Sequence, residues 1–249
     1  TLCIAGKNSV ATRALDIAAE YVPKGKLVAC PNPEDSGQDS WQPSFRKHAR
    51  QAGIKTETLA NLKNRADIIF VSLEYSRIIK TDEMASQWFY NIHFSLLPAY
   101  KGCFTSYWPI MNGDNYSGVT LHEIDWGIDT GSIVAQRDFP IDDNTTAFDL
   151  YLAYMENAVR LFQEHLPRLL TPEYVTATPQ GIFGSSYYSR DSVDFKNREI
   201  SFRASSEQVL RQIRPLTFPA YQRPTFQGRN IVSFANTTTR SQLAPGSIV

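Results

Sequence analysis

Three short, almost entirely apolar runs punctuate the first part of the chain, at residues 2–5, 26–30 and 67–71. Runs of this length are typical of strands that are buried on both faces, as in a parallel sheet. The stretches between them, 10–21 and 41–52, are amphipathic and are predicted to be helices. This alternation of strand and helix favours an α/β fold, a doubly wound and mostly parallel sheet.

Further elements follow, and the character of the chain changes after residue 167. Strands are predicted at 90–93, 118–124 and 133–136, the last two as a hairpin, and a long helix at 147–166 that opens on a capping box of Thr146 and Asp149. We expect a catalytic domain over 1–170, a connecting segment over 171–193 and a small C-terminal α+β appendage over 194–249. The appendage has a helix near 206–213 and a strand at 230–234.

Charge and composition exclude several classes of protein. Lys plus Arg and Asp plus Glu both number 25, so the net charge is zero and the usual basic excess of nucleic-acid binders is missing. Cys3, Cys30 and Cys103 form no CxxC pair, and the four histidines show no metal-ligand spacing. No apolar run approaches the roughly 20 residues of a membrane helix, and no leader is recognisable. We therefore expect a cytoplasmic protein without a metal, a nucleic-acid partner or a membrane partner.

Two stretches carry the candidate chemistry. The first is Asn-Ile-His-Phe-Ser-Leu-Leu-Pro at 91–98, where Asn91 and His93 are two apart in a strand and point to the same face. The second runs from Gly118 to Gly131 and ends in a tight loop rich in Asp and Gly. By itself, the first is more often a pair of satisfied polar residues at a strand end, and the second a plain hairpin loop.

Taken together, the two stretches resemble the folate-dependent formyltransferases, a family of methionyl-tRNA, glycinamide ribonucleotide and sugar-nucleotide enzymes. The resemblance is dense from Asn91 to Gln136. It implies an α/β domain that uses N10-formyltetrahydrofolate as co-substrate, with Asn91, His93 and Asp129 as catalytic residues. The chemistry agrees with these residue types, because an amide and an imidazole can stabilise a tetrahedral oxyanion while a carboxylate orients the ring and helps to move the proton.

The resemblance also implies that two loops hold the folate, mainly through backbone groups. One follows the third apolar run and the other precedes Asp129. The residues at these places are Arg77, Ile78, Ile79, Ile124, Asp125, Trp126 and Ile128. For Ile78 and Ile79, ordinary packing in the core is an equally good interpretation.

The acceptor is the least constrained part of the prediction. The loop with Lys7, Asn8 and Ser9 precedes a helix and is either a phosphate cradle or a simple helix cap. Lys101 is a further candidate for contact with a diphosphate, or a solvated surface lysine. Tyr187 and Tyr221 are candidates for stacking on a nucleotide base, or for ordinary packing of the C-terminal unit.

The residues after the catalytic region resemble those of sugar-nucleotide formyltransferases. This resemblance implies a dTDP-linked amino sugar, with dTDP-4-amino-4,6-dideoxyglucose as the expected acceptor, a role in O-antigen and lipopolysaccharide biosynthesis, and a homodimer. No residue decides between a 3-amino and a 4-amino sugar. The alternatives are a glycinamide ribonucleotide formyltransferase, a truncated methionyl-tRNA formyltransferase and a non-catalytic folate-binding regulator.

Overall fold

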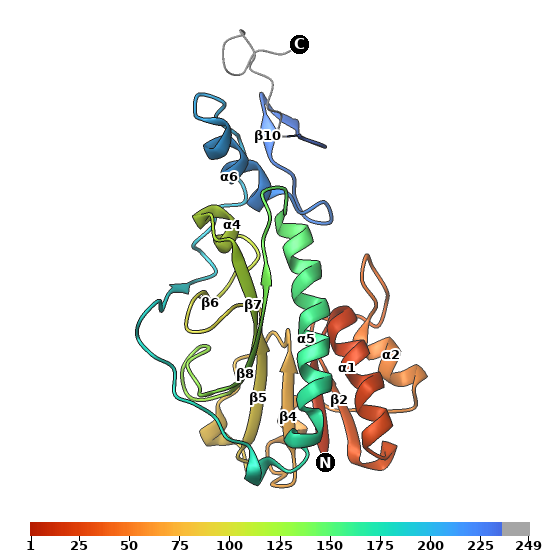
Figure 1. Ribbon diagram of the computed structural model, residues 1–249. Helices are drawn as coiled ribbons and strands as arrows, with labels where there is room; N and C mark the ends of the chain where they lie inside the picture. The colour runs from red at the N-terminus through yellow and green to blue at the C-terminus, as the bar shows by residue number, and fades with distance from the viewer. Residues whose placement is uncertain (236–249) are drawn as a thin grey trace. The chain divides into compact units, whose positions relative to one another are not determined.

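A seven-stranded sheet forms the centre of the computed structural model, which describes residues 1–235. Its strand order is β3-β2-β1-β4-β5-β7-β8 (Figure 1). The bounds are β1 Leu2–Gly6, β2 Leu27–Pro31, β3 Lys55–Thr56, β4 Ile69–Leu73, β5 Trp88–His93, β7 Tyr116–Glu123 and β8 Ile133–Pro140. The pairs from β3 across to β5 are parallel, and β7 runs antiparallel to β5. The predicted α/β class and mostly parallel sheet are confirmed.

Helices follow the strands as the alternation predicts. They are α1 Asn8–Tyr21, α2 Phe45–Gln51, α3 Leu59–Leu62 and α5 Ala147–Leu169, with short 3-10 turns η1 Lys24–Lys26, η2 Thr81–Glu83 and η3 Pro172–Tyr174. The second helix begins later than predicted because Ser44 caps it, with its hydroxyl accepting from the Lys47 amide at 3.1 Å. The expected cap of α1 by Asn8 or Ser9 is wrong, since Lys7 occupies the N-cap position without a side-chain bond.

The long helix α5 begins as predicted and ends later. The Asp149 amide donates to the Thr146 hydroxyl at 3.2 Å, and the Thr146 amide donates to the Asp149 carboxylate at 3.0 Å. The helix continues through Pro167 to Leu169 rather than stopping at residue 166. A proline this close to the end removes only one helical hydrogen bond, and burial of the Leu169 side chain stabilises the additional residues of the helix.

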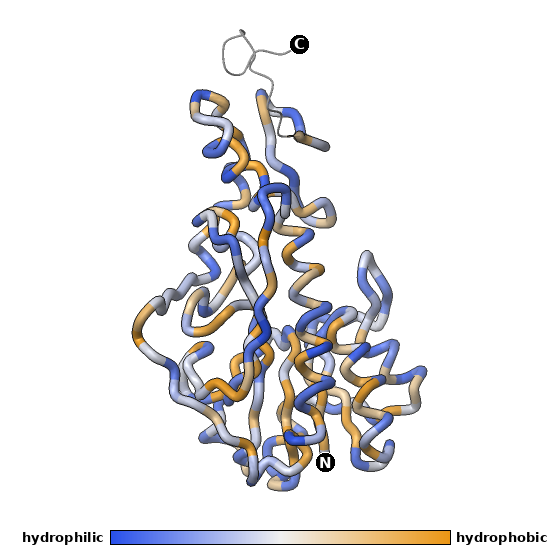
Figure 2. Tube along the Cα trace, viewed as in Figure 1, coloured by the Kyte–Doolittle hydropathy of each residue, from blue (hydrophilic) through white to orange (hydrophobic). Residues whose placement is uncertain are grey.

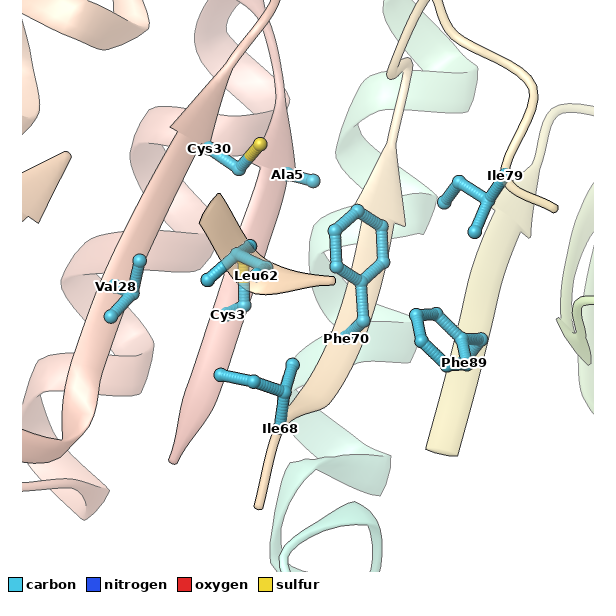
Figure 3. Close-up of a cluster of buried hydrophobic side chains, with 9 residues drawn as sticks. All are labelled: Cys3, Ala5, Val28, Cys30, Leu62, Ile68, Phe70, Ile79 and Phe89. Carbon is cyan, nitrogen blue, oxygen red and sulfur yellow. The ribbon is translucent and has the colours of Figure 1, made fainter. Parts of the chain in front are cut away.

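Apolar side chains cover one face of the sheet in the cluster drawn in Figure 3. Its members come from β2, β1, β4 and β5, together with Ile68 just before β4, Leu62 of α3 and the loop residue Ile79: they are Cys3, Ala5, Val28, Cys30, Leu62, Ile68, Phe70, Ile79 and Phe89. In Figure 3 the helices in the pale red of α1 and the pale green of α5 lie behind the strands, on the face away from these side chains. Figure 2 shows apolar colour along the central strands and alternating colour along α5. Burial on both faces explains why these strands read as continuous apolar runs.

The chain divides into two compact units. The first contains 1–101, 118–138 and 154–186, and the second contains 102–117, 139–153 and the residues from 187 onward. The predicted boundaries at 170 and 193 differ from this division, because β7, β8 and α5 each have residues in both units. The functional boundaries stay a prediction, and residues 236–249 of the predicted appendage lie outside the described residues.

The second unit has a small core of its own. Its elements are α4 Trp108–Asn112, α6 Ser206–Leu216, β10 Thr225–Phe226 and β11 Arg229–Asn230, and a further pair joins β6 Lys101–Gly102 to β9 Tyr187–Tyr188. Ile200, Val209 and Ile213 are buried together there. The predicted strand over 230–234 is wrong beyond Asn230, since β10 and β11 form a hairpin of two residues each around Gly228, which has φ 73°.

Candidate active site

Asn91 and His93 stand on the same face near the carboxyl end of β5. They alternate with Tyr90 and Ile92, which are buried on the other face. Because β5 pairs in parallel with β4 and antiparallel with β7, the strand is fixed from both sides. The predicted placement of both residues on one face is therefore present in the fold.

Asp129 reaches these two residues from the loop between β7 and β8. Its Oδ2 lies 3.4 Å from Nδ1 of His93, and its Oδ1 accepts from Nδ2 of Asn91 at 3.4 Å. The loop is shaped by Asp125, whose Oδ1 accepts from the Gly127 amide at 3.0 Å and from the Thr130 hydroxyl at 2.7 Å. Asp129 itself has φ 54°, a left-handed conformation that aspartate tolerates better than most residues. The structure thus brings the three expected catalytic residues together.

The other nitrogen of His93 is held by a backbone carbonyl. Nε2 lies 2.8 Å from the oxygen of Tyr100 and donates to it. The segment from β5 to Tyr100 is fastened inside the protein, where the buried Thr120 hydroxyl donates to the Ser95 carbonyl at 2.7 Å and accepts from the Leu97 amide at 3.1 Å. Both ring nitrogens of His93 therefore face oxygen acceptors, and the doubly protonated ring can donate to both.

His122 is a fourth member of the cluster that the sequence reasoning missed. It lies on β7 directly opposite Asn91, and its Nε2 is 3.1 Å from Nδ2 of Asn91. Its Nδ1 is 2.7 Å from the carbonyl oxygen of Glu123. The signal was its alternating strand position, but its use required knowing that β5 and β7 pair with Asn91 opposite His122.

The two predicted folate loops meet the same apolar cluster. Ile79 is 5% exposed and belongs to the cluster, and Ile124 packs against it. Trp126, at 94% exposed, leaves a large apolar surface beside Asp129 in the sequence. Ile78 is also exposed, at 73%, so the core interpretation holds for Ile79 and not for Ile78. Arg77 forms an ion pair with Glu34 at 3.3 Å.

An open cavity of about 300 Å³ adjoins the first of these loops. It is lined by Arg77, Tyr75 and Arg46 together with Pro31 at the end of β2. Burial raises the pKa of the Tyr75 hydroxyl well above its usual range, and its hydrogen bond with the Cys30 thiol acts in the same direction. The phenol therefore stays protonated across the physiological range.

The predicted phosphate cradle already has protein partners. Asn8 donates from Nδ2 to the Glu74 carboxylate at 3.4 Å, and Lys7 Nζ lies 4.0 Å from the same carboxylate. The Ser9 amide donates to Oε1 of the buried Gln42 at 3.0 Å. The N-terminus of α1 thus holds oxygen atoms of the kind that a phosphate would present.

The remaining predicted contacts are dispersed. Lys101 donates from Nζ to the Ser185 hydroxyl at 2.9 Å. Tyr187 and Tyr221 belong to the second unit, where both are more than half exposed, and Tyr221 packs on Phe218 with ring centroids 5.1 Å apart. Within residues 1–235 no cluster of three or more His, Cys, Asp or Glu side chains is placed to hold a metal ion, and no helix is long and apolar enough to cross a membrane.

Comparisons with known proteins give the wider setting. The formyl transferase family model matches residues 31–166. An N-formyltransferase from Helicobacter canadensis, solved with folinic acid and dTDP-3-aminofucose, is 41% identical, with TM-score 0.89 over 93% of this chain and 86% of that one. WlaRD, a sugar 3N-formyl transferase solved in the presence of dTDP and 5-N-formyl-THF, is 42% identical, with TM-score 0.89 over 93% and 84%.

Curated relatives are longer than this chain. The bifunctional polymyxin resistance protein ArnA of Wigglesworthia glossinidia brevipalpis is 29% identical over 191 residues, which are 75% of this chain and 29% of that protein. The chain spans about half the length of the methionyl-tRNA formyltransferases that it also matches. The sheet and the matches define an α/β domain of the group-transfer class. Within that class, the chain belongs to the formyl transferase family.

Proposed function

We propose that this protein is a sugar-nucleotide N-formyltransferase, which moves the formyl group of N10-formyltetrahydrofolate to the amine of a dTDP-linked amino-dideoxy sugar. The observation that carries the proposal is the convergence of Asn91 and His93 on Asp129, whose carboxylate oxygens lie 3.4 Å from a side-chain nitrogen of each. The two solved relatives at 41% and 42% identity, with their folates and dTDP ligands, support the same substrates.

The proposed mechanism gives Asn91, His93 and Asp129 one role each. The acceptor amine attacks the formyl carbon, a C–N bond forms, and negative charge collects on the formyl oxygen. Asn91 donates from Nδ2 to that oxygen, and His93 donates from Nε2 once the oxygen has displaced the Tyr100 carbonyl. Each such donor is typically worth about 100- to 1000-fold in rate. Asp129 accepts the proton that the amine loses and passes it to N10 of the folate, as the bond between N10 and the formyl carbon breaks and the carbonyl forms again.

The folate is proposed to lie between the two loops that meet at the apolar cluster. Ile79 is buried in the apolar cluster and the partly buried Ile124 packs against it, while the exposed Trp126 and Ile128 supply apolar surface for an aromatic ligand. Backbone groups of 77–79 and 124–128 remain the proposed polar contacts. Asp125 holds its loop through the Gly127 amide and the Thr130 hydroxyl, so its contribution is to the shape of the site.

A nucleotide diphosphate is proposed to enter at the N-terminus of α1. There a phosphate would replace the oxygen of Gln42 at the Ser9 amide and compete with Glu74 for Lys7 and Asn8. Lys101, Tyr187 and Tyr221 stay proposed acceptor contacts. The family resemblance implied a 4-amino sugar, although no residue decided between the two positions. The two relatives at 41% and 42% identity favour a 3-amino sugar, and we propose the 3-amino acceptor. A cytoplasmic homodimer that serves O-antigen synthesis is part of the same proposal.

The test is a turnover assay that follows tetrahydrofolate release from N10-formyltetrahydrofolate. The acceptor panel contains dTDP-3-amino and dTDP-4-amino dideoxy sugars, a UDP-amino sugar, glycinamide ribonucleotide and methionyl-tRNA. We expect turnover on the dTDP-3-amino sugar, and its near loss in His93→Ala and Asp129→Ala. His48→Ala, which alters a histidine paired with Asp16 on α2 and α1, is the control and should turn over like the wild type. Activity confined to another acceptor, or retained in either site variant, would refute the assignment.

A further inference from the structure

We propose that His122 is a positioning residue that fixes which end of the Asn91 amide faces the reacting atoms. The inference rests on the proposed formyl transfer and deepens it. His122 is 2% exposed and lies opposite Asn91 in the β5–β7 register, so its ring is confined by the sheet. Its two ring nitrogens make contacts that assign them different tasks.

The hydrogen bond at Nδ1 fixes the tautomer. The carbonyl of Glu123 can only accept, so Nδ1 carries the proton and donates across 2.7 Å. In the neutral ring, a proton on Nδ1 leaves the lone pair on Nε2, which also lies 3.7 Å from Oδ1 of Asp129. That lone pair accepts from Nδ2 of Asn91 at 3.1 Å. The backbone carbonyl of Glu123 thus fixes the tautomer of His122, and His122 in turn fixes the orientation of the Asn91 amide.

The bond at Nε2 selects one orientation of a nearly symmetric side chain. An asparagine amide has a donor end and an acceptor end of similar size, and rotation by half a turn exchanges them. In the observed orientation the NH₂ group serves both Nε2 of His122 and Oδ1 of Asp129. The opposite orientation would place the Asn91 carbonyl oxygen against a lone pair and a carboxylate, so three acceptors would meet without a proton.

The selected end is the one that formyl transfer needs. The bond from Asn91 to Asp129 is long, at 3.4 Å, whereas the bond to His122 is 3.1 Å. The N–H that faces Asp129 can therefore exchange this acceptor for a developing oxyanion. The other N–H stays on His122 and keeps the NH₂ group in place. His122 does not touch substrate in this scheme, and its whole effect on catalysis passes through Asn91.

The experiment compares His122→Leu with His122→Gln, whose amide oxygen can replace Nε2 as the acceptor. For His122→Leu we expect kcat to fall by about tenfold or more, with the loss bounded by that of Asn91→Ala at about 100- to 1000-fold. KM for both substrates should stay near the wild-type value, and His122→Gln should recover most of kcat. A purely structural role would instead move the thermal midpoint without this split between the two variants.

A double variant isolates the route of the effect. Because His122 acts through Asn91, the double variant Asn91→Ala with His122→Leu should have the same kcat as Asn91→Ala alone. Three results would each overturn the proposal. They are a double variant in which the kcat losses of the two single variants multiply, a wild-type kcat in His122→Leu, and a kcat in His122→Gln as low as that of His122→Leu.

A measurement without turnover separates this proposal from the proposed function. In ¹⁵N-labelled protein, imidazole NMR shifts report which nitrogen carries the proton, and the signals lost in His122→Gln identify His122. We expect the Nδ1–H tautomer, and an Nε2–H tautomer would overturn the positioning role. If the wild type formylates none of the five acceptors, the proposed function fails, whereas the tautomer still decides the geometry around Asn91.

Discussion

At the scale of single residues, Asp35 shows how one carboxylate organises the segment between β2 and α2. Its Oδ1 accepts from the Gly37 amide at 2.9 Å and the Ser44 hydroxyl at 2.6 Å, and its Oδ2 accepts from the Arg46 amide at 2.9 Å. Burial works to raise the pKa of Asp35, but these donors outweigh it and the pKa is lowered. The segment includes Gln42, which binds the Ser9 amide at the N-terminus of α1.

Asp35→Asn should therefore destabilise the protein in a pH-dependent way. A carboxyl whose folded pKa is lowered stabilises the fold above its unfolded pKa of about 3.9, and the contribution is lost as the pH falls through the lower, folded value. We expect a loss of about 1 kcal/mol at pH 7, modest because the group is partly exposed, and a shrinking difference below about pH 4. Urea unfolding of both proteins from pH 7 to pH 3 measures it. Asp82→Asn, at an exposed position of η2, should unfold like the wild type at every pH, and an equal loss there would remove the explanation.

The residue types of the site were predictable, and their partners were not. Asn91, His93 and Asp129 stand in motifs that can be read along the chain, and the structure brings them together. His122 was overlooked because its value depends on a pairing between strands that are separated by more than twenty residues. Gln42 and Glu74 were overlooked for a similar reason, since each reaches the N-terminus of α1 from a distant loop.

At the scale of elements, the loop between β7 and β8 must fold tightly to deliver Asp129. Gly131 is the point of closest approach, because a Cβ there would lie 1.8 Å from the carbonyl oxygen of Glu123. That contact involves backbone, so neither atom can move without shifting β7 or the loop. Gln180 holds the same turn from outside by donating from Nε2 to the carbonyls of Asp129 and Gly131 at 2.9 and 2.8 Å.

Gly131→Ala should displace Asp129 and reduce both activity and stability. Overpacking of this kind typically costs about 1–3 kcal/mol, and misplacement of a catalytic group by about 1 Å can cost about 100-fold in rate. We expect a lower kcat together with a lower thermal midpoint, measured on the same preparation. Gly25→Ala is the matched control, because a Cβ at Gly25 meets nothing within 4 Å. Wild-type kcat in Gly131→Ala would show that the loop does not set the position of Asp129.

Local patterns predicted elements better than they predicted extents. The capping box of Thr146 and Asp149 placed the start of α5, because both partners lie within one turn. Its end was misplaced, since the packing of Leu169 outweighs the local preference of Pro167 to stop a helix. The strand predicted over 230–234 ends at Asn230, because its partner β10 is only two residues long and offers no further strand to pair with.

At the scale of the whole molecule, charge separates two acceptor classes within one family. Lys plus Arg and Asp plus Glu number 25 each, so the chain has no net charge. Much of its positive charge is also engaged on the surface, as in the ion pairs of Arg13 with Glu156 at 2.7 Å and Lys63 with Glu83 at 3.0 Å. Affinity for tRNA depends on neutralising phosphates with unpaired cations, and each contact releases counterions. A dTDP-sugar has only two phosphates, so a few local groups suffice for it.

This chain should accordingly bind labelled initiator tRNA weakly at about 150 mM salt. The Debye length of the solution is then about 8 Å, so the salt screens cations that are scattered over the surface. Fluorescence anisotropy over a salt series measures the affinity and its dependence on salt. Binding of a dTDP-amino sugar in the same buffer, measured by its competition with dTDP, is the positive control and shows that the acceptor site is folded. Micromolar tRNA binding with a steep fall in log K against log salt would contradict the prediction, because such a slope counts phosphate contacts that a neutral chain is not expected to make. A tRNA would then be the better candidate for the acceptor, as the names of the longer methionyl-tRNA formyltransferases indicate for those relatives, of which this chain spans about half.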